Sequence, residues 1–262
     1  MPKVSVIIGI YNCAPYLQEA LDSLYAQTFQ DFEIILCEDG SSDNTYEIAL
    51  ENQKNHSNIV LLKNPHNLGL NQTLNNCLAV AKGEYIARMD GDDISVPNRF
   101  EVLTRFLDEH PEYDFVTSQM QYFDADGVFR VGKGEGEPKI TDFPKHTPFN
   151  HAPCMVRKYA YDAVGGYTVD ERLLREEDYE LWIKMYKHGF KGYTLNEPLY
   201  MMRDDRNATL RRNMKARKNE AYVKHLAVKE FDLPFYYNVH CLKPLILGMM
   251  PTLLYEFLHR RA

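Results

Sequence analysis

The first 93 residues alternate between short apolar runs and segments whose apolar side chains recur at helical spacing. Four predominantly apolar runs lie at residues 4–10, 32–37, 59–62 and 84–90. The first is apolar and β-branched along nearly its whole length, which is typical of a strand buried on both faces of a sheet. One run follows another after about 25–30 residues, which leaves room for a crossover helix. The pattern predicts right-handed strand–helix–strand units and a mostly parallel sheet with helices on both faces.

Polar loops follow the carboxyl ends of all four predicted strands. Tyr11 follows the first strand, Asp39 the second, Asn67 the third and Asp90 the fourth. Ligands of open parallel sheets bind beyond the carboxyl ends of the strands. We therefore expect one crevice to gather these side chains.

Three carboxylates stand within four residues, at Asp90, Asp92 and Asp93. Like charges this close repel one another, so the cluster needs a compensating cation. Carboxylate oxygens suit hard divalent ions such as Mg²⁺ and Mn²⁺, which commonly hold phosphate oxygens as well. The turn predicts a metal–phosphate site; a solvated acidic turn is the alternative that these residues alone leave open.

The charge of the chain is divided unevenly along its length. Residues 1–202 carry 18 Lys and Arg against 31 Asp and Glu, whereas residues 203–262 carry 12 against 6. An acidic body disfavours a nucleic-acid partner, because phosphate backbones are bound by clustered bases. Hydrophobic residues make up 45% of the chain and aromatic residues 12%, which favours a filled core over disorder.

Cysteine usage and the first residues bear on the compartment. Five cysteines without a CxxC spacing favour a reduced, cytoplasmic protein over a disulfide scaffold or a zinc site. The first apolar run begins at Val4 without the basic region, longer apolar core and cleavage site of a signal peptide. No stretch reaches the roughly 18 consecutive apolar residues that a membrane span needs. We expect a cytoplasmic protein that can work at the inner face of the cell membrane.

The C-terminal tail combines basic residues with a short apolar run. The run at 244–255 is too short to cross a bilayer and contains Pro244 and Pro251. Bases beside a short apolar segment suit the surface of an anionic membrane, so we expect peripheral membrane contact. The alternative is a helical tail that packs on the domain, or on a second subunit to form a homodimer.

Five short motifs, each weak alone, occur in the order and spacing of a known family. They are Tyr11-Asn12, Glu38 to Asp43, Asn67 to Gly69 with Asn75, Asp90 to Asp93, and Glu177 to Trp182. Together they resemble the family 2 glycosyltransferases of the GT-A fold, over about residues 3–205. The resemblance implies an α/β fold with a Rossmann-like, mostly parallel sheet flanked by helices. It also implies inverting transfer of one sugar from a nucleotide donor, usually UDP-linked, with Mn²⁺ or Mg²⁺ as cofactor.

The resemblance implies roles for individual residues. Tyr11 would pack on the base, Asp39 would accept a hydrogen bond from uracil, and Asp92 would bind the metal. The donor-binding set is Ile10, Tyr11, Asp39, Asn67, Gly69, Asp90, Gly91 and Asp92. Asp178 matches the catalytic base, which takes the proton of the attacking hydroxyl, and Glu176 and Glu177 are alternatives to it. Contacts with the acceptor are expected from His151, Glu177 and Trp182.

One position departs from the family pattern. Many members have a histidine that binds metal or diphosphate where this chain has Asp205. A carboxylate there can bind a metal but would repel a diphosphate, so Asp205 is a candidate metal ligand beside Asp92. The Gln-x-x-Arg-Trp pattern of processive synthases does not occur in the sequence, which favours single-sugar transfer.

The expected organisation has three parts. Residues 1–95 form the nucleotide-sugar-binding half, residues 96–205 the acceptor-binding and catalytic-base half of the same domain, and residues 206–262 the basic and apolar helical tail. Expected partners are a nucleotide-sugar, UDP-linked before others, and a glycan or lipid-linked acceptor of cell-surface polysaccharide synthesis. Two other functions stay open: a nucleotide-sugar-binding protein of the same fold without turnover, and a nucleotidyltransferase. The second usually needs a glycine-rich, basic phosphate loop after the first strand, and residues 9–13 are neither.

Overall fold

The alternation of strands and helices over the first 93 residues is confirmed by a computed structural model, which describes residues 1–204 and 213–249. The strands are β1 Val4–Ile10, β2 Phe32–Glu38, β3 Ile59–Lys63 and β4 Tyr85–Arg88. The helices between them are α1 Ala14–Tyr25, α2 Thr45–Asn55 and α3 Leu70–Val80. The four strands pair in parallel, so their carboxyl ends meet at one edge of the sheet.

The second half extends the same sheet on the other side of β4. Its elements are β5 Ile94–Ser95, α4 Arg99–Glu109, β6 Phe115–Asp124, β7 Gly127–Val131, β8 Met155–Arg157, α5 Lys158–Val164, the 3-10 turn η1 Glu171–Leu173, α6 Glu177–Lys187 and β9 Gly192–Arg203. Within the described residues the strand order is β3-β2-β1-β4-β8-β6-β9-β5, with β7 paired to β6. β8 is antiparallel to β4 and to β6, and β6 is parallel to β9. β6 and β9 therefore run in the direction of β4, and their carboxyl ends reach the same edge.

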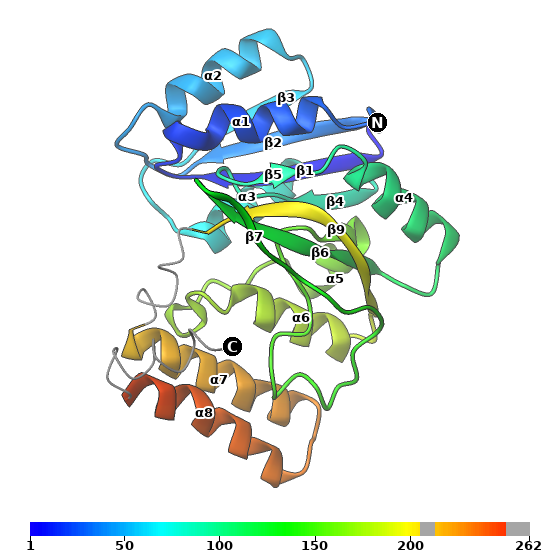
Figure 1. The fold of residues 1–262 in the computed structure, drawn as a ribbon, viewed down its shortest axis with the longest axis vertical. Helices are drawn as coiled ribbons and strands as arrows, with labels where there is room; N and C mark the ends of the chain where they lie inside the picture. The colour runs from blue at the N-terminus through cyan, green and yellow to red at the C-terminus, as the bar shows by residue number, and fades with distance from the viewer. Residues whose placement is uncertain (205–212, 250–262) are drawn as a thin grey trace.

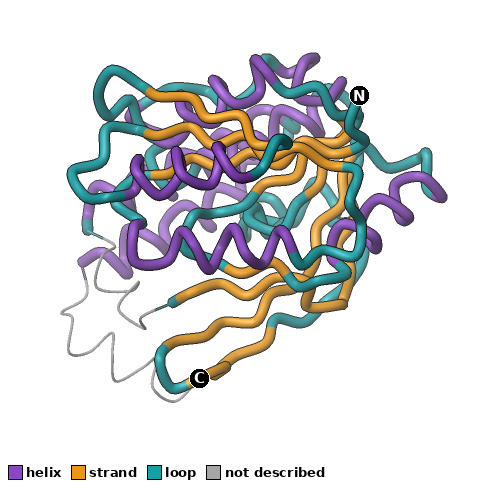
Figure 2. The backbone as a smooth tube through the Cα atoms, turned by 90° about the horizontal axis from the view of Figure 1, so that it is seen from above, coloured by secondary structure: helices purple, strands orange, loops and turns teal. Residues whose placement is uncertain are grey.

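Helices cover both faces of the sheet, as predicted (Figures 1 and 2). On one face lie α1, α2 and α4, where Leu17, Leu21 and Leu24 of α1 are fully buried because their spacing places them on one side of the helix. On the other face lie α3, α5 and α6, with Leu74 and Leu181 in a second core. Each fully buried large apolar side chain contributes about 1.5–3 kcal/mol, so the two cores fix the sheet firmly.

The described part of the C-terminal tail is helical. It consists of α7 Met214–Glu230, the 3-10 turn η2 Phe235–Asn238 and α8 Val239–Met249. α7 lies against α6, and α8 lies on the far side of α7 (Figure 1). Two basic residues of the tail, Arg217 and Lys224, are buried, so α7 packs on the domain. Among the residues that the structure describes, no helix has both the length and the apolar character needed to cross a bilayer.

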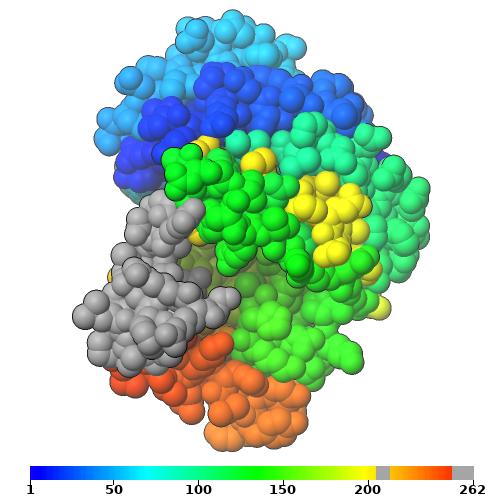
Figure 3. Space-filling model, in the orientation of Figure 1, coloured from blue at the N-terminus to red at the C-terminus, as the bar shows by residue number. Residues whose placement is uncertain are grey.

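The long segment between β7 and β8 crosses the front of the molecule, where the green residues stand between the blue N-terminal half and the orange helices (Figure 3). Gly136 pairs with Thr194 of β9, each amide donating to the other's carbonyl oxygen at 3.0 Å. Lys224 Nζ of α7 donates to the carbonyl oxygen of Lys145 at 2.6 Å. The segment is thus anchored to the sheet at one end and to the C-terminal helices at the other.

Candidate active site

The loops after β1 and β2 are joined at the carboxyl edge of the sheet. The Asp39 amide donates to the Ile10 carbonyl oxygen at 3.0 Å, and the Ser42 amide donates to Asn12 Oδ1 at 2.9 Å. Asn12 has a left-handed backbone with a φ of 49°, which asparagine tolerates better than most residues. Tyr11 stands at the tip with half of its surface exposed. Its ring is available as a surface on which a flat base can stack.

Asp39 ties the loop after β2 to the loop after β3. One carboxylate oxygen accepts hydrogen bonds from the Leu68 amide at 2.7 Å and from Asn64 Nδ2 at 2.8 Å, and the other accepts from the Gly69 amide at 3.0 Å. Asp39 is buried, whereas Asn67 is exposed. Because a carboxylate can accept about four hydrogen bonds, Asp39 keeps capacity for a ligand. The predicted donor-binding residues of these two loops therefore lie together.

The three carboxylates of the turn after β4 have three different environments. Asp90 forms a paired hydrogen bond with Arg88, with Nη1 to Oδ2 at 2.8 Å and Nη2 to Oδ1 at 2.5 Å. Asp93 is buried and accepts the Arg203 amide at 2.7 Å; burial, with the charges of Asp90 and Asp92, raises its pKa to about 8. Asp92 is exposed, although crowding by the surrounding protein and the charge of Asp90 still raise its pKa. Asp92 is thus the carboxylate most open to an ion from solvent.

Arg88 brings a protein cation to the acidic turn, where we had predicted a metal. Its side chain is buried at the end of β4. Burial alone would lower the pKa of Arg88, but the Asp90 charge and nearby phenol groups outweigh it, and the pKa is raised. The positive charge of Arg88 opposes the rise that crowding causes in the pKa of Asp92 and that burial causes in the pKa of Asp178. The buried Arg99 donates from Nη2 to the Arg88 carbonyl oxygen at 2.6 Å and so holds the end of β4.

A second arginine, Arg203 at the end of β9, fixes the turn from the other side. Its Nε donates to the Asp92 carbonyl oxygen at 2.9 Å, and its Nη2 lies 2.5 Å from Glu19 of α1. Together with the bond from its amide to Asp93, these contacts hold the backbone of the acidic turn between β9 and α1. The candidate ligand Asp205 lies outside the described residues.

Asp178 stands in the first turn of α6, where the sequence placed it. The helix begins at Glu177, and Asp178 Oδ1 accepts a hydrogen bond from the Tyr179 amide at 2.8 Å. Burial raises the pKa of Asp178, and the Asp90 charge adds to the rise while the Arg88 charge opposes it. Burial and the Asp178 charge raise the pKa of Glu177 to about 7. Asp178 and the acidic turn therefore belong to one electrostatic cluster.

Asn75 of α3 holds the loop that leads from α5 towards α6. Its Oδ1 accepts the Tyr167 amide at 2.8 Å and its Nδ2 donates to the Tyr167 carbonyl oxygen at 2.8 Å. The neighbouring Gly166 has a φ of 69°, and a Cβ there would come within 2.5 Å of Asn75 Oδ1. A side chain at position 166 would therefore break the contact between α3 and the loop that leads towards α6.

Two residues expected to contact an acceptor are buried. Trp182 has no exposed surface and stacks on Phe115 with 4.7 Å between ring centres. It lies on the apolar face of α6 that faces the core, so its burial does not favour the acceptor contact expected of its side chain. His151 is buried as well, with Nε2 2.8 Å from the Tyr167 hydroxyl. Burial, with the Arg88 charge beside it, holds the pKa of His151 well below its usual range, so the ring is neutral.

The donor set fits a divalent cation held jointly with a ligand. Among the described residues, no group of three or more His, Cys, Asp or Glu side chains could hold a metal by itself. Mg²⁺ does not need such a cage, since one or two carboxylates, waters and phosphate oxygens commonly bind it. Asp90 and Asp93 are engaged by Arg88 and Arg203, whereas Asp92 is exposed on a fixed backbone. Asp92 therefore suits the role that we predicted for it.

Three residues of the site were not predicted: Arg88, Arg203 and Asn64. The sequence does contain a signal for Arg88: it stands two positions before Asp90, so its positive charge can offset the repulsion between the carboxylates. Arg203 and Asn64 contact residues far away in the sequence or on another loop, and no spacing rule points to such partners. They became visible only with the register of the sheet.

Residues 5–165, more than half of the chain, match the model of the family described as Glycosyl transferase family 2. EpsE of Bacillus subtilis (strain 168), a protein named as a glycosyltransferase, is 40% identical over 263 residues, which cover 99% of this chain and 94% of that protein. An Escherichia coli protein named UDP-Gal:alpha-D-GlcNAc-diphosphoundecaprenol beta-1,3-galactosyltransferase is 30% identical over 218 residues, with 80% and 78% covered.

Solved structures share the fold. TarS of S. aureus, residues 1-349 in complex with UDP-GlcNAc, has a TM-score of 0.72 at 21% identity, covering 94% of this chain and 71% of that one. The mannosyltransferase PcManGT from Pyrobaculum calidifontis, in complex with GDP-Man and Mn²⁺, has a TM-score of 0.68 at 16% identity, covering 95% and 70%. The predicted GT-A fold is thus confirmed, and the chain belongs to the family 2 glycosyltransferases.

Proposed function

We propose that this glycosyltransferase moves one sugar, with inversion, from a UDP-sugar or another nucleotide-sugar to a hydroxyl group of a glycan or lipid-linked acceptor, in cell-surface polysaccharide synthesis. The observation that carries the proposal is that the buried Arg88 pairs with Asp90 of the acidic turn, and that Asp178 lies close enough for both charges to act on its pKa. The substrate classes are supported by the name of the Escherichia coli relative, which states a UDP-sugar donor and a diphosphoundecaprenol-linked acceptor.

The donor would bind over the carboxyl ends of β1, β2 and β4. Its base would stack on Tyr11, and the uracil N–H would donate to Asp39 beside Asn67 and Gly69. Asp90 would face the ribose and the donor sugar. The turn lies close on β1, since a Cβ on Gly91 would come within 3.1 Å of Ile10 Cγ2. That close approach supports Ile10 and Gly91 as the floor under the diphosphate.

Asp178 would act as general base. The acceptor hydroxyl is a poor nucleophile near neutral pH, so its proton passes to the Asp178 carboxylate as its oxygen attacks the anomeric carbon. The bond from that carbon to the diphosphate oxygen breaks on the opposite face, the nucleoside diphosphate leaves, and the configuration inverts. A carboxylate whose pKa is raised holds the proton better than an ordinary one, and such a base typically contributes about 10²–10⁴-fold to the rate.

Asp92 would hold the divalent cation, Mn²⁺ or Mg²⁺, with Asp205 as a second candidate outside the described residues. When bound, the cation stabilises the negative charge that develops on the departing diphosphate. Arg203 and Arg88 serve this step by fixing the turn and by limiting the repulsion between its carboxylates.

The protein would meet its acceptor at a membrane surface, through an apolar stripe on the turn η2 and helix α8. The stripe consists of exposed side chains at helical spacing, Phe235, Val239, Leu242, Ile246 and Met249, each more than half exposed. Such a stripe on one face marks an interaction surface. From 233 to 249 the sequence contains no acidic residue, and Lys243 is exposed among the apolar ones.

These features favour an anionic bilayer as the occupant over a second copy of the chain. Basic residues near an anionic leaflet are attracted by about 1 kcal/mol each, and the sequence beyond the stripe, residues 250–262, holds further apolar residues together with Arg260 and Arg261. A lipid-linked acceptor, as the Escherichia coli relative's name states for that protein, would be presented at the same surface.

A donor screen tests the proposed function. The purified full-length protein is incubated with a panel of UDP-, GDP- and dTDP-sugars, with and without Mn²⁺, and release of the nucleoside diphosphate is measured. We expect metal-dependent release from at least one UDP-sugar. Tight UDP binding without release from any donor would favour the alternative of a binding protein without turnover. Release of pyrophosphate from a nucleoside triphosphate and a sugar phosphate would favour a nucleotidyltransferase.

A further inference from the structure

The segment just before α6 decides where the helix of the base begins. It runs from η1 through Leu174, Arg175 and Glu176, and the Glu176 amide donates to the Leu173 carbonyl oxygen at 2.8 Å. Arg175 has a left-handed backbone, with a φ of 71°. A residue other than glycine keeps such a conformation only where its surroundings hold it there. The start of α6, and with it Asp178, therefore depends on what restrains this segment.

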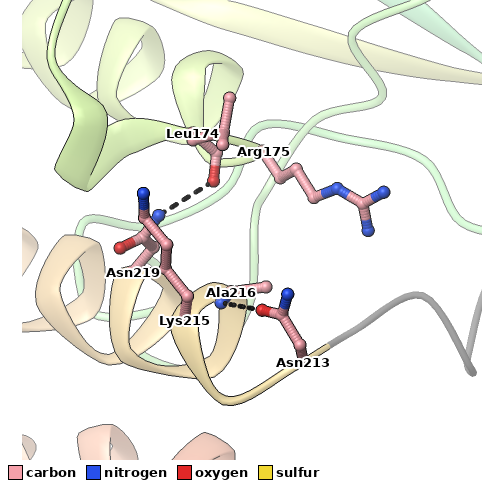
Figure 4. A pocket seen from close by; sticks show the side chains of 6 residues that line it. All are labelled: Leu174, Arg175, Asn213, Lys215, Ala216 and Asn219. Atoms are coloured by element: carbon pink, nitrogen blue, oxygen red, sulfur yellow. Dashed lines mark hydrogen bonds between the residues drawn. The ribbon is translucent and has the colours of Figure 1, made fainter.

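The C-terminal helix α7 restrains the segment through one side chain. Asn219 Nδ2 donates to the carbonyl oxygen of Glu171 at 3.2 Å and to that of Leu174 at 3.1 Å, so both hydrogens of its amide are used. Figure 4 draws the bond to Leu174, the residue directly before Arg175. Asn219 is only 7% exposed, which shields the two bonds from competing water.

The helix that carries Asn219 is itself fixed to the body of the protein. Val223 and Ala227, one and two turns further along α7, are fully buried in the core that also contains Tyr179 and Leu181 of α6. Spacings of four residues put Asn219, Val223 and Ala227 on the same face of the helix. The face of α7 that packs on α6 thus also holds the segment that precedes α6.

Close packing does not hold the segment on this side. A cavity of about 130 Å³ lies between it and α7, lined by Leu174, Arg175, Asn213, Lys215, Ala216 and Asn219 (Figure 4). α7 also contacts the preceding turn, through the exposed ion pair of Lys215 with Glu171 at 3.4 Å and through Tyr222, whose ring centre is 4.8 Å from the Arg172 guanidinium. Exposed pairs of this kind contribute little. Of these contacts between α7 and the segment, the two Asn219 bonds are the ones shielded from water.

We propose that Asn219 is a positioning residue for the catalytic base. It holds the left-handed step at Arg175, and through that step it sets the place of Asp178 relative to the reacting hydroxyl. The inference rests on the proposed function only in naming Asp178 as the base. It extends the catalytic unit into α7, a helix that the sequence pattern groups with the tail.

Hydrogen exchange tests the restraint without any substrate. Asn219→Ala is compared with Lys218→Ala, a change of the exposed neighbour on the same helix, in the full-length protein. We expect amides of the peptide 171–179 to exchange about tenfold faster in Asn219→Ala, because two hydrogen bonds are lost, while peptides of β1 and β2 stay unchanged. Lys218→Ala should match the wild type throughout. Unchanged exchange at 171–179 in Asn219→Ala would overturn the proposal.

Kinetics test the effect on the base. Release of UDP from UDP-glucose, UDP-galactose and UDP-N-acetylglucosamine is measured with Mn²⁺, far below the unfolding temperature. We expect Asn219→Ala to lower kcat about tenfold while the affinity for UDP stays within twofold, because misplacement of a catalytic group affects the chemical step. An equal kcat in the two proteins, or a loss confined to UDP affinity, would contradict a positioning role.

A second substitution provides a rescue. Glycine adopts a left-handed backbone without strain, so Arg175→Gly in the Asn219→Ala background should restore slow exchange and part of the lost kcat. A merely structural role of Asn219 predicts no such rescue. If Arg175→Gly does not rescue, the backbone at Arg175 is not what shifts when the Asn219 bonds are lost. If the wild type releases a nucleoside diphosphate from no donor of the full UDP-, GDP- and dTDP-sugar panel, the proposed function fails, while the exchange arm still decides whether Asn219 holds the segment.

Discussion

Asp92 differs from its two acidic neighbours in being exposed while they are engaged by arginines. We predict that Asp92→Ala abolishes the gain in UDP affinity that Mn²⁺ brings, because a diphosphate would then face Asp90 and Asp93 without a cation to offset their charge. Calorimetric titration of UDP with and without Mn²⁺ measures this gain. Asp162→Ala, which removes an exposed carboxylate on α5, is the control and should keep the full effect of the metal. A retained effect in Asp92→Ala would exclude Asp92 as a ligand.

Glu177 has a pKa raised to about 7 by burial and by the charge of Asp178. The folded protein therefore holds the Glu177 proton more tightly than the unfolded chain, and this contribution to stability is present below about pH 4.5 and is lost as the pH rises through about 7. We predict that Glu177→Gln, which fixes the neutral form, gains stability relative to the wild type over this window, by up to about 3 kcal/mol.

Urea unfolding of both proteins at pH 5 and pH 8 measures the difference. Parallel changes with pH would mean that Glu177 titrates normally. The same variant also bears on the choice of base. At pH 6 the wild-type Glu177 is already mostly protonated, so Glu177→Gln should keep its rate of UDP release within about threefold. A loss of about 10²-fold would make Glu177, and not Asp178, the base.

Among the elements, the loop after β2 and the loop after β3 depend on one glycine. Gly40 has a φ of 76°, and a Cβ there would come within 2.7 Å of the Asn67 amide nitrogen. We predict that Gly40→Ala lowers UDP affinity at least about tenfold, because it separates Asp39 from the Leu68 and Gly69 amides; losing such bonds to a buried carboxylate costs about 1.5–3 kcal/mol each.

The hairpin turn between β6 and β7 offers a matched control. Gly127 also has a positive φ, of 111°, but nothing lies within 4 Å of the place of its Cβ. Gly127→Ala therefore shares the backbone strain, about 1 kcal/mol of stability, without the collision. Calorimetry and thermal unfolding of both variants separate the two effects. Equal UDP affinities in Gly40→Ala and Gly127→Ala would show that the joined loops do not bind the donor.

Local pattern predicted the elements of the first half because each is complete within about a dozen residues. The spacing of Leu17, Leu21 and Leu24 predicts α1. The spacing of Leu70, Leu74 and Leu78 predicts α3, which ends one residue earlier than expected. β9 was harder to predict because it spans Gly192–Arg203 with Pro198 inside, and its pairing with β6 shifts register twice. Asp178 could be placed by motif, whereas the contacts of Arg88 and Arg203 depend on the fold around them. The motif that contains Trp182 does not by itself tell which side of the helix faces the core.

At the scale of the whole molecule, the C-terminal helices divide the tail into two roles. α7 packs on the domain, so a truncation near residue 220 would cut a buried helix, and point substitutions are the better test of membrane binding. We predict that the wild type co-sediments with liposomes containing anionic lipid at low salt. The variant Phe235→Ser, Leu242→Ser, Ile246→Ser should stay in the supernatant because it loses the apolar stripe.

Val128→Ser, Phe129→Ser, Val131→Ser removes exposed apolar side chains of β7 instead and should sediment like the wild type. If both variants sediment, or if the wild type and the β7 variant both stay in the supernatant, the membrane is removed from the proposal. A wild-type dimer in light scattering that becomes monomeric only in the stripe variant would identify a second copy of the chain as the occupant.

The most direct test of the account compares the wild type with Asp178→Asn in a single assay of UDP release from its preferred donor with Mn²⁺, alongside the affinity of each for UDP. Asparagine preserves the size of the side chain and its hydrogen bond from the Tyr179 amide but cannot take a proton. We predict a fall in kcat of about 10²-fold or more, with the affinity for UDP nearly unchanged. Near-normal release by Asp178→Asn, in a protein that still binds UDP, would contradict it.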